Sequence, residues 1–372
     1  MQTYASLAVV TVTTRNYFHR ARALMADVEK FLPGAVRLTA CVDDMGDVIP
    51  EDAASIGYFS SAAMGLPRYQ QLAFALNPTA LCCALKAHVV NRALAVNGIT
   101  RVLYLDNDIG LYRTPDEILQ MLEQHSVVLT PHHLTPLPAN SQPDEYCLIP
   151  YGMFNAGMFA VRKCEEAERF MTWWGKWLLD PRHSNGYWGY DQVWLNYVPV
   201  YCPNYGVLRD PGYNVAFWNL PERNLDVKHS CFTCGSSPLT AFHFSHFDER
   251  NPSVLVTKKG ITNLSATPAT VALGQCKAEA WEDHGRSECL SWGYGYQKWP
   301  DGSKVLNAER EAACALWDEI PPDLDLWSES FPRDHPHLYK RIKAPPPKFS
   351  VRLSGALRRV WNKAVQSSPA RN

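Results

Sequence analysis

Residues 101–119 read RVLYLDNDIGLYRTPDEIL, and this stretch decides how the rest of the chain is interpreted. Arg101–Leu105 is a short, mostly apolar run typical of a buried strand, and Asp106-Asn107-Asp108 follows it directly. Because residues i and i+2 of an extended chain point the same way, both carboxylates would face one site. Paired oxygen ligands suit Mg²⁺ or Mn²⁺. The alternative is a solvated turn, since Asp-x-Asp often occurs by chance.

The segments before this strand alternate between two patterns. β-Branched and apolar runs predict strands, and apolar residues at helical spacing predict helices. The predicted order is strand 7–13, helix 17–31, strand 35–42, helix 79–96 and strand 101–105. This alternation predicts an α/β fold with a mostly parallel sheet and helices on both faces. Ligands of such sheets bind beyond the carboxyl ends of the strands, where Asp43 and the two aspartates lie.

The organisation changes after this α/β pattern. Residues 126–248 are rich in aromatic residues, Gly, Pro and Asn, with short strands predicted at 126–130 and 158–161 and a helix at 165–179. The Trp173-Trp174-x-x-Trp177 cluster is interpreted as core of that helix. We expect three parts: an α/β domain over 1–260, a loop-rich accessory subdomain over 261–334, and a basic, Pro-containing tail over 335–372.

The composition is that of an ordinary globular protein. Of 372 residues, 46% are hydrophobic and 20% are charged, which excludes disorder and a disulfide-stapled miniprotein. No apolar run of 18 residues predicts a membrane span, and the N-terminus lacks the basic region of a signal peptide. The net charge of −1 hides an uneven distribution: residues 335–372 hold nine Lys or Arg and no acid, leaving −10 for residues 1–334.

The eleven cysteines form no disulfide framework. Their number is odd and their spacing irregular, which suits reduced, packed thiols in a cytoplasmic protein. Cys231-Phe-Thr-Cys234 is a lone C-x-x-C motif, and a structural zinc would need a second pair that does not follow.

Four ordered blocks together resemble glycosyltransferase family 8, a group of GT-A nucleotide-sugar transferases that includes glycogenin and bacterial lipopolysaccharide galactosyltransferases. The metal-binding strand of that family is similar to residues 101–119. Its F-N-[SA]-G, D-Q-D-x-L-N and H-F-x-G segments are similar to Phe154–Phe159, Tyr190–Asn196 and Phe242–His246. The resemblance covers roughly residues 1–255 and implies a GT-A fold, a Rossmann-like, mostly parallel sheet.

The resemblance implies a metal site. Asp106 and Asp108 would bind the ion, with His243 as the third protein ligand. An imidazole among carboxylates favours Mn²⁺ over Mg²⁺. Without the other blocks, His243 would be read as a core histidine between Phe242 and Phe244.

The resemblance also implies residues that contact the donor sugar. Asn155 would hydrogen-bond the sugar, and Ala156-Gly157 would allow close backbone approach. Asp191 would accept sugar hydroxyls, and Gln192 would lie under the anomeric carbon; both are assigned as catalytic. The alternative for this pair is a helix start, with Asp191 as the cap.

The remaining donor contacts are assigned around the phosphates and the nucleoside. Lys86, in the predicted helix 79–96, would meet the diphosphate, although it could equally be a solvated helix residue. Nucleoside contacts are expected from residues at the strand ends and from the centre of the aspartate turn: Thr13, Thr14, Asp43 and Asn107.

Two features depart from the family or go beyond it. His246 replaces the family glycine, and the Lys-Pro-Trp sequence that should follow is absent, so Arg250, Lys258 and Lys259 are candidate phosphate ligands. Residues 210–223 are both polar and aromatic. Asn214, Trp218, Asn219 and Arg223 in that block would line an acceptor sugar, or else form an aromatic-packed loop.

These observations predict a metal-dependent, retaining glycosyltransferase. It would move a hexose from a nucleotide diphosphate sugar, most simply a UDP-sugar, to a glycan or lipid-linked acceptor. One alternative is an inactive glycan- or nucleotide-binding protein. Another is a sugar nucleotidyltransferase, which is disfavoured because that chemistry needs a Gly-rich loop after the first strand, and Thr-Val-Thr-Thr-Arg-Asn stands there.

The basic tail raises the question of a membrane. Residues 349–366 place Leu353, Leu357, Val360 and Trp361 on one helical face, with basic side chains toward the other. Such a helix would lie on an anionic bilayer, giving a cytoplasmic protein with peripheral contact to the inner membrane face. The alternative is a terminal helix docked on the acidic body. Nucleic-acid binding is not expected, because no base-reading fold accompanies the charge.

Overall fold

The computed structural model describes residues 4–43, 45–141, 143–184, 190–229, 231–254 and 267–344. Its centre is a seven-stranded sheet with the order β3-β2-β1-β4-β7-β6-β8. All neighbouring strands are parallel except β7, which runs antiparallel to β4 and β6. The predicted α/β class with a mostly parallel sheet is therefore confirmed. The strands are β1 (Leu7–Thr13), β2 (Val36–Cys41), β3 (Tyr58–Ser60), β4 (Arg101–Leu105), β6 (Val127–Pro131), β7 (Phe154–Arg162) and β8 (Tyr205–Val207).

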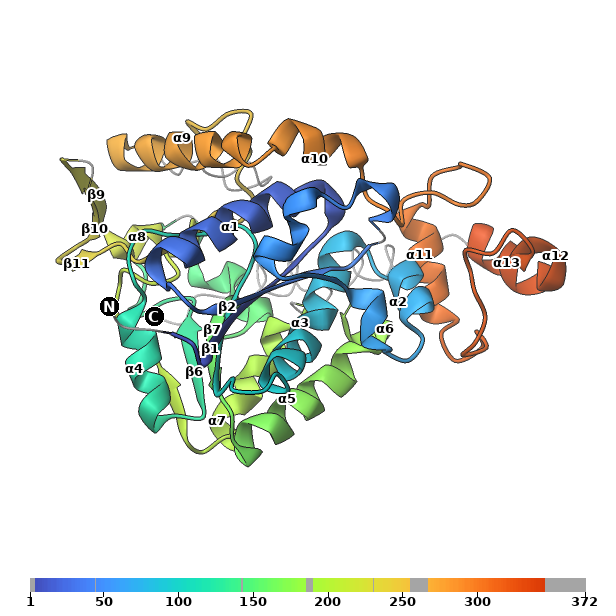
Figure 1. Cartoon of the computed structure of the whole chain (residues 1–372), viewed down its shortest axis with the longest axis horizontal. Helices are drawn as coiled ribbons and strands as arrows, with labels where there is room; N and C mark the ends of the chain where they lie inside the picture. Colours follow the sequence, from blue (N-terminus) through green and yellow to red (C-terminus); the bar gives the residue numbers. More distant parts are fainter. Residues whose placement is uncertain are drawn as a thin grey trace, which may run out of the picture.

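Helices cover both faces of this sheet (Figure 1). On one side, α3 (Pro78–Leu94) and α5 (Glu165–Leu178) enclose a core that includes Val10 of β1. On the other, α1 (Phe18–Phe31) and α4 (Asp116–Gln124) enclose a second core that includes Val9. Because successive strand residues point to opposite faces and both faces are covered, the strands are continuous apolar runs rather than alternating ones.

The antiparallel course of β7 brings its start to the carboxyl ends of the other strands. The Asp106 amide, just past β4, donates to the carbonyl of Gly157 in β7 (2.8 Å). A small two-stranded sheet lies at the same edge, where β5 (Ile109–Leu111) pairs antiparallel with β12 (Ala241–His243). In that pairing His243 lies opposite Ile109, so chain segments more than 130 residues apart meet beside the aspartate turn.

In its described residues, the region over 261–334 that was expected to be loop-rich contains four helices joined by longer irregular segments. The helix α9 (Pro268–Asp283) begins with a capping box between Thr267 and Thr270. A β-carbon added to Gly274 in this helix would lie 2.2 Å from the Pro252 carbonyl oxygen. The close approach requires a glycine, although glycine lowers helix propensity.

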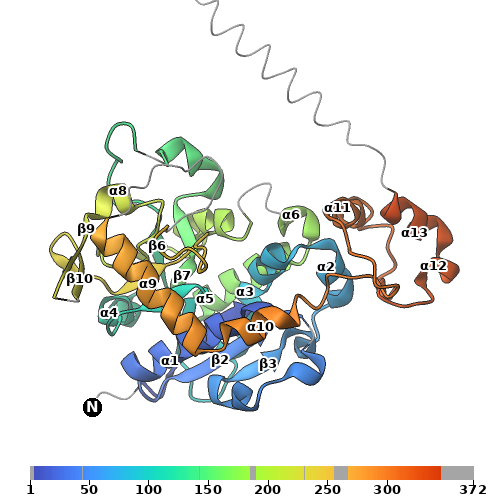
Figure 2. The same ribbon diagram turned by 90° about the horizontal axis from the view of Figure 1, so that it is seen from above.

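The C-terminal helices pack in two places. Both α9 and α10 (Arg286–Trp292) lie over α1 on the outside of the sheet (Figure 1). The helices α11 (Asn307–Ala315), α12 (Phe331–Asp334) and α13 (Pro336–Lys343) gather beyond α2 (Tyr69–Ala75) (Figure 2). Buried side chains of this group, among them Trp299 and Trp317, belong to the same apolar cluster as α2 and α3. The core therefore continues from the sheet into the C-terminal part.

The remaining elements are short. They are α6 (Pro181–Ser184), α7 (Val198–Tyr201), α8 (Leu220–Arg223), β9 (Leu225–Lys228), β10 (Cys231–Cys234) and β11 (Ser237–Pro238), with 3₁₀ turns η1 to η7, of which η7 (Gln192–Tyr197) concerns the site. All eleven cysteines lie in described ranges and are free thiols. Across the parts of the chain that the structure describes, no helix has the length and apolar content that a membrane span requires. The predicted amphipathic helix at 349–366, and with it the membrane hypothesis, lies outside the described residues.

Candidate functional site

Three potential metal ligands converge at the carboxyl ends of the parallel strands. Asp106 and Asp108 follow β4, and His243 ends β12. One ligand atom from each of the three lies within 4.8 Å of the other two. The Nε2 atom of His243 is 3.1 Å from Oδ1 of Asp108 and 3.9 Å from Oδ2 of Asp106. Two carboxylates and one imidazole form a donor set that fits a divalent cation such as Mn²⁺.

The second nitrogen of His243 sets how this imidazole is oriented. Nδ1 lies 3.2 Å from Oδ1 of Asn214, a side chain buried behind it. Since an amide oxygen can only accept, Nδ1 carries the proton and Nε2 faces the carboxylates. This is the arrangement in which an outer partner fixes the tautomer of a metal-ligating histidine.

The charges of these groups depend on one another. Burial opposes the charged form of His243, but the Asp108 and Asp106 carboxylates outweigh it and raise the pKa of the imidazole. Burial likewise favours the neutral form of Asp108, but His243 outweighs it and holds the pKa of that carboxyl well below its usual range. In the metal-free protein the two side chains therefore form a buried ion pair, whose proton a metal would displace.

Lys86 joins the aspartate turn to the segment that starts η7. Its Nζ atom lies 2.9 Å from Oδ1 of Asp106 and 3.0 Å from Oδ2 of Asp191, and it donates to the Ala156 carbonyl at 3.1 Å. The Lys86 side chain is only 4% exposed. Burial opposes its charge, but the two carboxylates outweigh burial and raise its pKa. Lys86 is thus a buried cation that bridges the carboxylates of Asp106 and Asp191, and it is not a solvated helix residue.

Asp191 occupies the cap position of η7 without capping it. Its side chain makes no hydrogen bond to the first turn, and its carboxylate instead faces Lys86. Burial raises the pKa of Asp191 even though Lys86 acts in the opposite direction. The helix-cap interpretation of this residue is therefore not what its side chain does in the structure.

A chain of amides connects the start of β7 to η7. The Asn155 side-chain NH₂ donates to Oε1 of Gln192 (3.1 Å). Its oxygen accepts from the Gly157 amide (2.9 Å) and from the Asn214 side chain (3.1 Å). The residues assigned to the donor sugar therefore form one connected network beside the three metal ligands.

Gly157 has a specific steric reason to be glycine. A β-carbon at this position would lie 2.3 Å from Cε1 of His243 and 2.8 Å from Oδ1 of Asn155. Both contacts are shorter than real β-carbons make, so any larger residue would displace the imidazole or the amide. The resemblance assigned close backbone approach to this glycine, and the structure shows that the approaching group is His243.

His132 also belongs to this network, and the sequence analysis did not single it out. It follows β6, and its Nδ1 lies 2.9 Å from the Gly152 carbonyl, while Nε2 lies 3.4 Å from the Asn155 amide nitrogen. Burial lowers the pKa of His132 to about 4, so it is neutral at physiological pH. The only available signal was a His-His pair directly after a predicted strand.

The residues assigned to the nucleoside lie at the ends of β1 and β2 and in the aspartate turn. Asn107 donates to the Val12 carbonyl (3.1 Å) and to Oγ1 of Thr13 (3.0 Å), which ties the aspartate turn to β1. The Thr14 hydroxyl is buried and has no hydrogen-bond partner among the described residues. These side chains line the strand ends next to the Asp106–Asp108 turn.

Asp43 is held by a segment from the far end of the chain. Its Oδ1 accepts from the Arg15 amide (2.8 Å) and its Oδ2 from the Gly295 amide (2.7 Å). The Arg15 guanidinium in turn donates to the carbonyls of Trp292 and Gly293. Burial raises the pKa of Asp43 despite these donors. The segment after α10 therefore forms a wall beside Asp43, just past the carboxyl end of β2.

The acceptor assignments divide into two groups. Asn214 and Trp218 lie at the cluster: the Trp218 ring meets the His243 ring edge-on, with centroids 5.2 Å apart. Asn219 is buried and braces the loop by donating to the His132 and Asn214 carbonyls. Arg223 is buried against Glu222 (3.1 Å), and no contact with the metal ligands is found for it among the described residues.

The candidate phosphate ligands are not placed at the cluster. Arg250 forms an exposed ion pair with Asp248 (2.8 Å). Lys258 and Lys259 lie outside the described residues. A different arginine, Arg20 of α1, is electrostatically coupled to Asp108; its guanidinium pairs with Glu249 (3.1 Å) and lies over the Trp281 ring.

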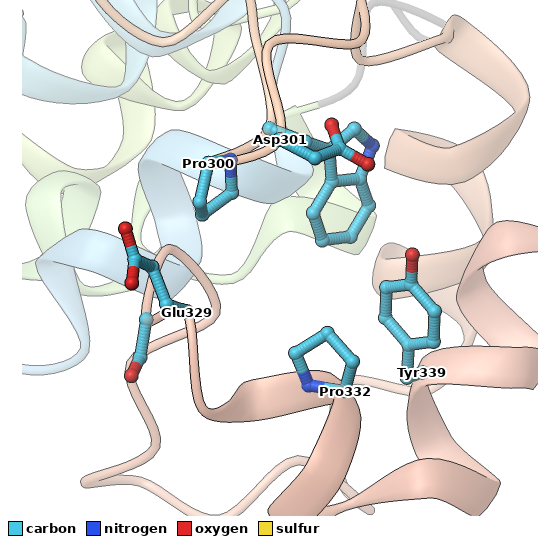
Figure 3. A pocket seen from close by; sticks show the side chains of 7 residues that line it. Pro300, Asp301, Glu329, Pro332 and Tyr339 are labelled. Atoms are coloured by element: carbon cyan, nitrogen blue, oxygen red, sulfur yellow. The ribbon is translucent and has the colours of Figure 1, made fainter.

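A separate cavity of about 260 Å³ lies among the C-terminal helices. It is lined by Trp299, Pro300, Asp301, Ser328, Glu329, Pro332 and Tyr339 (Figure 3). None of the residues assigned to the donor, the metal or the acceptor is among these lining residues. The Lys343 ammonium already lies over the Trp299 ring, 4.4 Å from its centroid.

Comparisons with known proteins give only distant similarities. No family model matches the chain. An uncharacterized Bacillus subtilis (strain 168) protein, YfnF, is 22% identical over 247 residues, covering 64% of this chain and 81% of that protein.

Solved structures with detectable similarity include two glycosyltransferases. The galactosyltransferase LgtC, in complex with donor and acceptor sugar analogues, is 14% identical with a TM-score of 0.43, covering 75% of this chain and 95% of that chain. A glycosyltransferase involved in glycosylation of the PBCV-1 major capsid is 12% identical with a TM-score of 0.37, covering 65% and 94%.

Proposed function

We propose that this chain is a metal-dependent glycosyltransferase of the GT-A type, which transfers a hexose from a nucleoside diphosphate sugar, taken here as a UDP-sugar, to a glycan or lipid-linked acceptor. The observation that carries the proposal is the convergence of the Asp106–Asp108–His243 ligand set with the Lys86–Asp191 ion pair and the Asn155–Gln192 amides at one sheet edge. The classes of activity of the two solved structures agree with it, but similarity at that level adds no weight.

Asp106, Asp108 and His243 would hold Mn²⁺ or Mg²⁺ in this site. The bound ion would neutralise the diphosphate charge that develops on the leaving nucleotide. Lys86 holds the Asp106 carboxylate through their 2.9 Å ion pair, and Asn214 orients the His243 imidazole so that Nε2 faces the two carboxylates. The protein thus pre-orients its ligands with buried partners, so that little reorganisation is needed when the donor binds.

The sugar would be bound by the adjoining polar groups. The Asp191 carboxylate would accept sugar hydroxyls, and the Asn155 and Gln192 amides would orient the ring beneath the anomeric carbon. Trp218 and Asn214 border the same space and would contact the acceptor sugar. Arg223, which lies apart from this cluster, would act on the acceptor only indirectly, through the loop that Glu222 anchors to Leu134 (3.0 Å).

We further propose that the reaction retains the anomeric configuration. An inverting transferase needs a general base in line behind the sugar. The Asp191 carboxylate is committed to Lys86, and the amide of Gln192 cannot take a proton. NMR of the first-formed product should show the anomer of the donor, and the opposite anomer would contradict the retaining mechanism.

The function is tested by donor turnover with and without metal. Wild-type protein should hydrolyse or transfer from UDP-glucose or UDP-galactose only when Mn²⁺ or Mg²⁺ is present. Asp106→Asn and Asp108→Asn should abolish this turnover while the far-UV spectrum and the unfolding transition persist. An exposed acid far from the site, Glu165, supplies a matched control as Glu165→Gln. Metal-independent turnover that survives both Asn variants would refute the metal site.

A further inference from the structure

A group of five aromatic rings forms a continuous surface on one side of the molecule, here called the aromatic face. It consists of Trp173 and Trp177 on α5, Trp194 and Tyr197 on η7, and Tyr201 on α7, which lies against α5. The Trp177 and Trp194 rings are stacked with centroids 5.4 Å apart, as are those of Tyr197 and Tyr201. Trp173 joins the two stacks through edge-on contacts with Tyr201 (4.9 Å) and Trp194 (5.7 Å).

This surface is open to solvent, although the sequence analysis had interpreted the Trp173-Trp174-x-x-Trp177 cluster as helix core. Only Trp174 is fully buried. Trp177, Tyr197 and Tyr201 are 39%, 45% and 41% exposed, and Val200 beside them is 70% exposed. An exposed apolar patch of ordered rings is costly in water and usually marks a binding surface.

The aromatic face is connected to the proposed sugar site through the chain itself. η7 starts at Gln192, whose side chain accepts from Asn155 in the site. The indole of Trp174, on α5, donates to the Asp191 carbonyl (3.2 Å). Six 3₁₀ residues rise about 12 Å, so η7 carries the chain from Gln192 in the site to Tyr197 in the aromatic face.

The charges around the aromatic face are mixed. The exposed charged residues of α5 nearest to it in sequence are Glu168, Arg169 and Lys176, and the His183 ring of α6 meets the Trp177 ring edge-on (5.0 Å). A surface for an anionic bilayer would need an excess of Lys and Arg beside the rings, and a surface for a polyanion would need the same. A neutral partner fits this mixture better than either.

We infer that the aromatic face binds the acceptor as an extended, uncharged oligosaccharide chain, whose sugar residues pack their C–H faces on Trp177, Tyr197 and Tyr201. Pyranose rings offer flat C–H surfaces that suit exposed aromatic faces, while their hydroxyls stay in water or meet the Tyr hydroxyls. This inference rests on the proposed function, because that function makes a glycan the molecule to be positioned. It names the acceptor class and the surface that would hold the sugar residues of the glycan farthest from the one that reacts.

The test measures glycan binding by full-length protein. Wild-type protein is applied to an array of neutral oligosaccharides that includes maltoheptaose, cellopentaose, N-acetylchitopentaose and mannopentaose, and the strongest ligand is titrated calorimetrically. The variants are Tyr197→Ala/Tyr201→Ala, the ring-preserving Tyr197→Phe/Tyr201→Phe, and Ile49→Ala as a control that removes an equally exposed apolar side chain elsewhere.

The double Ala variant should bind the glycan at least tenfold more weakly, whereas the double Phe variant and Ile49→Ala should bind within about twofold of wild type. The double Phe variant keeps the rings and removes only the hydroxyl groups, so it separates ring packing from hydroxyl contacts. Three results would overturn the inference: no neutral glycan bound by wild type, binding unchanged in the double Ala variant, or ring-dependent binding to phosphatidylglycerol vesicles in place of glycans.

A second measurement, with UDP and Mn²⁺ as ligands, separates this inference from the proposed function. Thermal stabilisation by UDP with Mn²⁺ should be the same in wild type and in the double Ala variant, since neither tyrosine contacts the metal ligands. If wild type binds glycans through its rings but is not stabilised by UDP and Mn²⁺, the transferase proposal fails while the glycan surface stands. If UDP binds and glycans do not, the reverse holds.

Discussion

Replacing Lys86 by Met should be strongly destabilising, because Lys86 is the buried cation between two carboxylates. At 2.9 Å from Asp106 and 3.0 Å from Asp191, each pair contributes about 6 kcal/mol of Coulomb attraction at an effective dielectric of 20. Much of this offsets the cost of burying three charges. Removing one partner of a buried pair typically costs about 3–5 kcal/mol, because the remaining charge is left uncompensated.

A second buried lysine supplies the matched control. The Lys277 side chain is also 4% exposed, but its nearest carboxylate, on Asp27, is 4.0 Å away. Burial lowers the pKa of Lys277, whereas the carboxylates raise that of Lys86. Lys277→Met should therefore cost about 1 kcal/mol or less, or even stabilise, since no closely paired charge is lost. Both variants replace an equally buried lysine by methionine, so the comparison differs only in the carboxylates that the lysine contacts.

The assay is urea unfolding at 25 °C in EDTA, at pH 7.5 and pH 5. Lys86 has a raised pKa in the folded state, so its stabilisation is fully present below the unfolded value of about 10.4 and covers both conditions. Without Lys86, the pKa of Asp191 rises further, so protonation at pH 5 should relieve part of the cost. A deficit no larger than that of Lys277→Met, or one that grows on acidification, would refute the reasoning.

Three further predictions concern neighbouring residues. Gly157→Ala should leave the fold intact at a cost of about 1–3 kcal/mol but weaken Mn²⁺ binding about 10- to 100-fold in calorimetry, because the added methyl displaces His243. Mn²⁺ affinity of the wild type should fall as the pH is lowered through the raised pKa of His243, with the loss beginning above pH 6.5, and His243→Asn should bind more weakly but with less pH dependence. Asp43→Asn should destabilise by about 1–3 kcal/mol and speed amide hydrogen exchange at Gly295, since an amide cannot accept from both backbone donors in the same way; unchanged exchange there would count against the Asp43 contact.

The fold class could be predicted because local patterns and global architecture agree in the first 110 residues. Apolar strands buried on both faces, separated by helices with clear ends, leave few alternatives. The helix α3 illustrates this: Asn77 caps it by accepting from the Ala80 amide (2.9 Å), and Pro78 occupies its first turn. At Gly274 in α9, by contrast, the residue is dictated by a long-range contact with the Pro252 carbonyl.

The site could be predicted only in part, and for the same reason. Asp106 and Asp108 are adjacent in sequence, so their common direction follows from the strand. That His243 meets them depends on the pairing of β12 with β5, which no local pattern encodes and which only the family resemblance anticipated. His132 is placed in the site by its position after β6 and by its contact with the Gly152 carbonyl, and neither feature forms a recognisable sequence motif.

The wall built by Gly295 against Asp43 has a consequence for biosynthesis. The two residues are 252 positions apart, and ribosomes add roughly 5–20 residues per second, so about 13–50 s separate their appearance. Asp106 and Asp108 of the turn are both made within that interval, whereas the Gly295 amide that holds Asp43 is not yet present. A ribosome that stalls between codons 244 and 295 therefore leaves a nascent protein whose sheet strands have all been made but whose Asp43 carboxylate still lacks the Gly295 donor.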